Sequence, residues 1–148
     1  EFMIRIYEAT EPSDLLAEAF ARLLPQLSER MTAPGREAVA RIVASPATRQ
    51  LVAAAEDGRI VGLLSVALYD VPSGRKAWIE DVVVDAAARG FGAGEALVRA
   101  AQAHAAEGGA GKVMLTSNPS RGAARRLYAK MGFKEAETTV FACKTDTE

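Results

Sequence analysis

An apolar segment followed by three closely spaced glycines is the feature that most restricts how this chain can fold. Residues 76–84 (KAWIEDVVV) have the β-branched and aromatic content of a strand. Gly90, Gly92 and Gly94 follow, and apolar residues then recur at helical spacing to about Ala106. The segment therefore predicts a strand, a glycine-rich turn and a helix in direct succession.

Such a turn is well suited to hold an anion. Glycine allows positive φ and close approach of a ligand to the main chain. The first amides of a helix have no internal partner and lie at the positive end of the helix dipole. Together these groups suit a pyrophosphate, and Arg89 adds positive charge at the rim. A connector that holds no ligand remains the alternative.

The turn matches neither of two common nucleotide motifs. It lacks the Lys-Ser/Thr pair of a P-loop. Glu95 and Leu97 stand where the pattern G-x-G-x-x-G requires its third glycine. ATP or GTP chemistry and the dinucleotide fingerprint are therefore both disfavoured.

The N-terminal part predicts a strand and two helices. Residues 3–9 alternate as a strand does, and a helix capped by Thr10 is expected after them. Pro25 is expected to end or bend this helix. A second helix is predicted over Arg36–Ala44, with Ser45-Pro46 as its stop.

The remaining elements complete a mixed, mostly antiparallel sheet flanked by helices. Asp57-Gly58 is a strong hairpin signal between strands 49–56 and 59–69. The later elements expected are strand 76–84, a helix from about Gly92 to Ala106, strand 112–116, a helix from Asn118-Pro119 to Met131, and one or two closing strands that include 139–143. The order β-α-α-β-β-β-α-β-α-β-β defines an α/β fold. A single domain over 3–148 is expected, with Glu1-Phe2 as a remnant of cloning.

Composition excludes several classes of function. Lys+Arg is 18 and Asp+Glu is 19, and a net charge of −1 argues against a nucleic-acid binder. The single cysteine, Cys143, forms no intrachain disulfide and is expected to be buried. The single histidine, His104, excludes two-His metal motifs, so no metal is expected. No apolar run is long enough to cross a membrane and no leader is seen, so a cytoplasmic protein without membrane partners is expected.

Two segments carry a resemblance to a known family. Arg89-Gly90-Phe91-Gly92-Ala93-Gly94 resembles the Q/R-x-x-G-x-G/A signature of the GNAT acetyltransferase superfamily. Asn118, Ala124, Leu127-Tyr128 and Gly132-Phe133 resemble its second signature, N-x-x-A-x-x-L-Y-x-x-x-G-F. The resemblance implies this family's fold, a site for acetyl-CoA and transfer of its acetyl group to an amine.

The resemblance also implies which residues contact acetyl-CoA. The amides from Phe91 to Glu95 would hold the pyrophosphate, and the main chain of Val82–Val84 would pair with pantetheine where the strand bulges and splays from its neighbour. Asn118 would hydrogen-bond pantetheine, although it serves equally well as a helix N-cap. The expected contact set is Val82, Val83, Val84, Arg89, Gly90, Phe91, Gly92, Ala93, Gly94, Glu95, Asn118, Arg121 and Tyr128.

Three side chains are candidates for proton transfer. Tyr128 could protonate the departing thiolate, although a core tyrosine would show the same helical spacing. Glu80 is favoured as base or acceptor anchor and Asp81 is second, with a solvated carboxylate as the alternative. Residues 79–84 also resemble the corresponding strand of glucosamine-phosphate N-acetyltransferases, but no matching phosphate site is evident.

The expected function is acetyl transfer from acetyl-CoA to a primary amine of a small molecule, by direct attack in a ternary complex. A peptide or protein amine stays open as the acceptor, and so does a larger acyl donor. A non-catalytic acyl-CoA sensor or scaffold is the main rival, and a regulatory module without CoA is a third reading. The identity of the acceptor and a homodimeric state are not readable from the residues.

Overall fold

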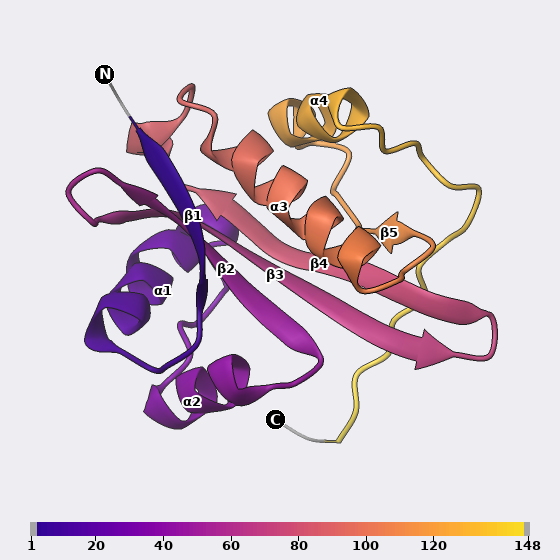
Figure 1. Cartoon of the computed structure of the whole chain (residues 1–148), viewed down its shortest axis with the longest axis horizontal. Coiled ribbons are helices and arrows are strands. Elements are labelled where there is room, and N and C mark those ends of the chain that lie inside the picture. Colours follow the sequence, from indigo (N-terminus) through magenta and orange to yellow (C-terminus); the bar gives the residue numbers. More distant parts are fainter. Residues whose placement is uncertain (1–2, 147–148) are drawn as a thin grey trace.

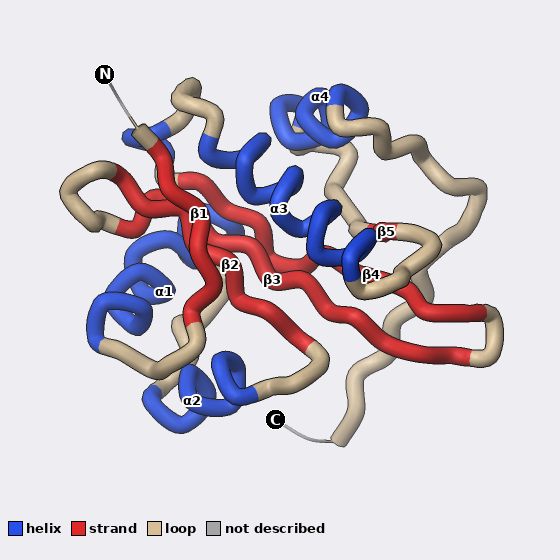
Figure 2. The backbone as a smooth tube through the Cα atoms, in the orientation of Figure 1, coloured by secondary structure: helices blue, strands red, loops and turns tan. Residues whose placement is uncertain are grey.

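Five strands pair in chain order, β1-β2-β3-β4-β5, and form one sheet. Helices cover both faces of this sheet (Figure 1). The computed structural model describes residues 3–146. Its elements are β1 (Ile4–Ala9), α1 (Asp14–Leu27), α2 (Arg36–Ala44), β2 (Thr48–Ala55), β3 (Ile60–Val71), β4 (Gly74–Val84), a 3₁₀ turn (Ala86–Ala88), α3 (Ala93–Glu107), β5 (Val113–Met114) and α4 (Gly122–Lys130). The sheet is the middle layer, with α1 and α2 on one side and α3 and α4 on the other (Figure 2).

The sheet is mixed, as the sequence predicts. β1 to β4 are antiparallel, whereas β4 and β5 run parallel. Side chains alternate across each strand, so neighbouring residues reach different cores. Leu63 packs with α1 and α2, and Leu64 packs with α3.

Helix α1 begins and ends later than expected. Ser13 is its N-cap, and the Ser13 hydroxyl accepts a hydrogen bond from the Leu16 amide at 3.1 Å, so Thr10 is not the cap. Pro25 lies inside the helix. A proline there removes one backbone hydrogen bond, but the burial of Leu23 and Leu24 holds the last turn against the sheet.

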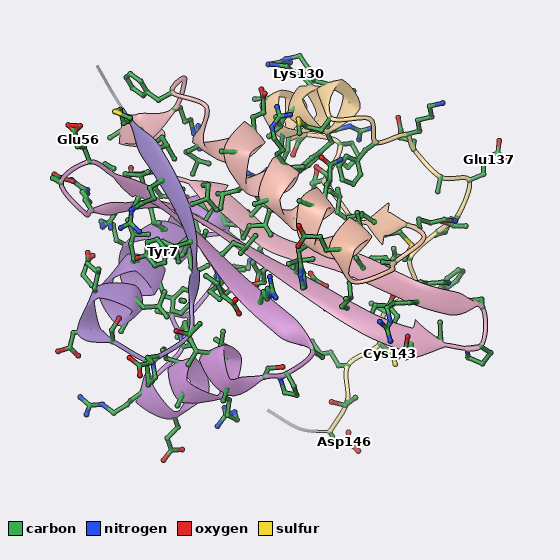
Figure 3. The ribbon with its side chains drawn as sticks, viewed as in Figure 1. Tyr7, Glu56, Lys130, Glu137, Cys143 and Asp146 are labelled. Carbon is green, nitrogen blue, oxygen red and sulfur yellow. The ribbon has the colours of Figure 1, made fainter. Side chains whose placement is uncertain are left out.

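The closing strands are the main error of the sequence-based prediction. Within the described residues 133–146 the chain forms no strand, and Val140 and Phe141 are 68% and 92% exposed. Cys143 is exposed on this tail rather than buried (Figure 3). Alternating residues form a strand only beside a partner, and the edge strand β5 offers just two residues for pairing.

Candidate active site

The glycine turn lies between the end of β4 and the start of α3. Gly90 and Gly92 have φ of 89° and 85°, the left-handed region that favours glycine, and a Cβ on either would meet nothing within 4 Å. Gly92 is the N-cap of α3. The Ala96 amide donates to the Gly92 carbonyl at 3.0 Å, so the amides of residues 93–95 have no partner inside the helix. This open, amide-lined turn fits the diphosphate of a nucleotide-like ligand.

Gly94 has a different reason to be glycine. A Cβ there would lie 3.2 Å from Leu127 Cδ2, so the missing side chain allows α4 to approach α3 closely. Next to it, the Glu95 carboxylate binds Lys130 Nζ at 2.7 Å, and Lys130 lies at the end of α4 (Figure 3). The same carboxylate also pairs with Arg99. The hydrogen bonds from Lys130 and Arg99 lower the pKa of Glu95. Two cations thus balance the one carboxylate in the first turn of α3.

Strand β4 has an open edge next to this turn. β5 pairs with it only at Ala77 and Trp78, so the rest of β4 separates from β5. The Asp85 amide donates to the Val61 carbonyl at 2.8 Å. Main-chain groups alternate along an antiparallel strand, so those of Val83 face β3 and those of Val82 and Val84 face the open edge. Of the three residues whose main chain was expected to pair with pantetheine, Val82 and Val84 therefore have main-chain groups free for a ligand.

A β-bulge interrupts β4 at the two candidate carboxylates. Glu80 lies opposite Ser65 and Val83 lies opposite Leu63, so Asp81 and Val82 together face one residue of β3. Asp81 has a φ of 50°, which aspartate tolerates better than most residues. Glu80 follows Ile79, which packs under α3, and so it points to the α1–α2 side of the sheet.

A cavity of about 480 Å³ lies on that side of the sheet. It is lined by α1, the segment before α2, α2 itself and the strands β2 to β4. Of the described residues, Asp81 and not Glu80 lines it. Burial, and then the charge of Asp81, raise the pKa of Glu80. The bulge therefore places both carboxylates on one face, with Asp81 in the cavity wall.

Tyr128 lies on the other side of the sheet, on α4. Its ring meets Phe133 edge-on, with centroids 5.8 Å apart. Burial raises the pKa of Tyr128, and the charge of Arg121 opposes this. Within the described part of the chain, its hydroxyl makes no hydrogen bond. A core tyrosine with a satisfied hydroxyl is thus not what the structure shows.

Asn118 is not the N-cap of α4. That helix begins at Gly122 after Arg121, three residues later than the sequence predicts. The Asn118 side-chain oxygen instead accepts hydrogen bonds from the amide and hydroxyl of Ser120, at 2.9 and 2.8 Å. This local turn competes with helix formation, and it leaves the Asn118 amide group for a ligand.

Asp85, which the sequence analysis did not single out, anchors the end of β4. It is buried and accepts hydrogen bonds from Arg22 at 2.9 Å and from the Ala87 amide at 3.1 Å. Burial acts to raise its pKa, but the hydrogen bonds from Ala87 and Gln26 and the charge of Arg22 outweigh burial and lower it. An aspartate directly before a 3₁₀ turn is a capping signal that could have indicated this role.

We expect Asp85→Asn to destabilise the fold by about 3 kcal/mol at pH 7, because Arg22 then lacks its buried partner. The folded-state pKa of Asp85 is lowered. Its contribution is therefore complete above the unfolded value of about 3.9 and is lost as pH falls through the folded value. Urea unfolding at several pH values measures this. Asp70→Asn, which breaks only an exposed pair with Arg75, is the control and should change little. Equal stability of Asp85→Asn and wild type at pH 7 would contradict the role.

The open edge of β4, the amide-lined turn and the cavity across the sheet together define an acyl-CoA-dependent N-acyltransferase fold. A family model described as "Acetyltransferase (GNAT) family" matches residues 6–133, and the chain belongs to this family. The protein is therefore an acetyl-CoA-dependent N-acetyltransferase, which confirms the fold, family and activity expected from the sequence.

Relatives and solved structures agree with this assignment. Two rice proteins (Oryza sativa subsp. japonica) are 37% and 38% identical to the chain: glucosamine 6-phosphate N-acetyltransferase 1 and a probable glucosamine 6-phosphate N-acetyltransferase 2. The matches cover 81% and 90% of this chain and 76% and 74% of the relatives. A Trypanosoma brucei acetyltransferase superposes with a TM-score of 0.75 at 28% identity, covering 97% of this chain and 100% of that one.

A further solved structure shows likeness of fold alone. Glucosamine-6-phosphate N-acetyltransferase from Arabidopsis thaliana has a TM-score of 0.77 at 23% identity and covers 98% of this chain and 99% of its own. Among residues 3–146, no group of three or more metal-ligating side chains is found. No described helix is long and apolar enough to span a membrane.

Proposed function

We propose that the protein acetylates a small amine of the amino-sugar class, by direct transfer from acetyl-CoA in a ternary complex. The observation that carries this is the bulge in β4, which separates an open strand edge from a cavity on the α1–α2 side. The volume, about 480 Å³, suits a small molecule rather than a protein surface. The two rice relatives, named for glucosamine 6-phosphate, support an amino sugar as the first class to test.

The turn and the strand edge hold acetyl-CoA in this proposal. The amides of residues 93–95 bind its diphosphate, and the main chain of Val82 and Val84 pairs with the pantetheine arm. Arg89, exposed and without an ion pair in the described region, adds charge at the rim, and the Asn118 amide donates to pantetheine. Main-chain amides at the open edge polarise the thioester carbonyl.

The carboxylates and Tyr128 move the protons. An alkyl ammonium has a pKa near ~10.4, so the amine must lose a proton before it attacks. Glu80 accepts that proton, directly or through water, while Asp81 anchors the ammonium in the cavity. The nitrogen bonds to the acetyl carbon, the carbon–sulfur bond breaks, and Tyr128 protonates the departing thiolate.

Asp81→Asn separates the roles of the two carboxylates. The charge of Asp81 contributes to the raised pKa of Glu80, so its removal lowers that pKa. A base works when deprotonated, so we expect the acid limb of kcat to move to lower pH. We also expect KM for the amine to rise about tenfold, with kcat above the limb nearly unchanged. A pH–rate profile measures this. A hundredfold loss of kcat at every pH would make Asp81 the base instead.

An acceptor screen tests the function as a whole. Thiol release from acetyl-CoA across amino sugars, other small amines and peptides should be fastest with amino sugars. Calorimetry with acetyl-CoA runs beside it. Tight binding without turnover on any amine would favour a non-catalytic acyl-CoA sensor, and the fastest turnover on a peptide would favour a protein acceptor.

A further inference from the structure

The sheet floor of the cavity carries a fixed polar pair. Gln50 is only 4% exposed, and its side-chain nitrogen donates to the carbonyls of Leu51 and Leu64, both at 3.3 Å. Its side-chain oxygen accepts the hydroxyl proton of Ser65 at 2.8 Å. Both residues line the cavity. The two carbonyls therefore fix the orientation of the Gln50 amide, and Gln50 fixes the hydroxyl of Ser65.

This pair determines which groups the floor can bind. A serine hydroxyl has one proton, and that of Ser65 is used by Gln50, so only its lone pairs remain for a ligand. Asp81, also in the wall, is likewise an acceptor when ionised. The floor therefore presents hydrogen-bond acceptors to the cavity, and it suits an ammonium group and sugar hydroxyls.

The wall formed by α2 has the opposite character. Arg41 lines the cavity and, within the region that the structure describes, forms no ion pair or hydrogen bond. Asp81 lines the same cavity, yet the two side chains do not come within ion-pair distance. Arginine has five donors in a planar fork and no acceptor. A ligand that fills this cavity thus meets acceptors on one side and an uncompensated cation on the other.

We propose that Arg41 binds an anionic group of the acceptor, so that the preferred acceptor is a small amine that also carries a phosphate or a carboxylate. The amine and hydroxyl groups lie against Ser65 and Asp81, and the anion lies against α2. This assignment rests on the proposed function, and it adds a specificity-determining residue that the sequence signatures do not contain.

Matched acceptor pairs test the proposal. Glucosamine and glucosamine 6-phosphate differ by a phosphate, and glucosamine and 2-amino-2-deoxyglucuronic acid differ by a carboxylate at C6. In wild type we expect kcat/KM to favour at least one anionic partner by about tenfold or more. Arg41→Gln should remove that preference through KM, with turnover of glucosamine, which has no anionic group, unchanged. Arg41→Lys should restore part of it, since it restores charge without the planar fork.

Arg36→Gln is the matched control, because Arg36 lies on the same helix and does not line the cavity. It should keep the wild-type preference. The proposal is overturned if Arg41→Gln keeps the preference, if Arg36→Gln loses it equally, or if wild type treats amines with and without the anionic group alike. Calorimetry with the anionic amines, in the absence of turnover, measures the contribution of Arg41 to binding separately from catalysis. Loss of all acetylation with intact Arg41-dependent binding would refute the proposed function and not this inference.

Discussion

Replacing Gly92 with aspartate is expected to weaken coenzyme A binding by about a hundredfold or more, in a protein that still folds. Gly92 is the N-cap of α3 at a φ of 85°. An aspartate there brings a negative charge to the amides that hold the diphosphate, and as a capping side chain it competes for them. Losing charge-assisted hydrogen bonds of this kind costs about 3 kcal/mol, which corresponds to roughly two powers of ten in Kd.

The strain of this substitution can be measured separately. Gly58, in the hairpin turn between β2 and β3, has a φ of 90°, and a Cβ there would also meet nothing within 4 Å. Gly58→Asp therefore carries similar backbone strain away from the turn, and it should bind coenzyme A normally. Gly92→Ala adds strain without charge and should lie between the two. Calorimetry measures the coenzyme A affinity of the three variants, and thermal unfolding shows whether each of them is folded. Undiminished affinity in a folded Gly92→Asp protein would remove the diphosphate site.

Tyr128→Phe is expected to lower kcat by about tenfold or more while acetyl-CoA affinity stays nearly intact. The raised pKa of Tyr128 keeps the phenol protonated at neutral pH, as an acid must be. Its hydroxyl has no partner elsewhere in residues 3–146, whereas its ring packs against Phe133. Phenylalanine keeps that packing and removes only the proton donor.

The pattern of kinetic change identifies the role. Loss of a transition-state proton transfer reduces kcat and kcat/KM together, whereas a binding contact would raise KM alone. Tyr69→Phe, at a half-buried tyrosine of β3, is the control and should turn over normally. Unchanged kcat in Tyr128→Phe, measured with a saturating amine, would remove Tyr128 from the mechanism.

Local rules were sufficient for the turn that defines the family. The need for positive φ at Gly90 and Gly92 depends only on the adjacent backbone, and the strand and helix around them follow from periodicity. The hairpin expected at Asp57-Gly58 is confirmed as well, although its strands are joined by residues 56–59 and not by two residues. Gly58 supplies the positive φ, 90°, that closes the turn. These features depend on residues a few positions apart, so the sequence predicts them.

Long-range pairing decided the rest. Gly94 lets α4 approach α3 closely at Leu127, and the strand expected over 139–143 fails to form because β5 offers too short an edge. Both outcomes depend on segments distant in the chain. No local pattern contains the length of a neighbouring strand or the distance between two helices.

The site divides in the same way. The sequence alone predicts the glycine turn before a helix, and it nominates Tyr128 and the pair of carboxylates on β4 as candidates. Only the tertiary structure puts Asp81 in the cavity wall, because the register of a bulge is set by the strand that it faces. Only the folded chain brings Arg41, Gln50 and Ser65 around one cavity, because they come from three separate elements whose packing no single segment encodes.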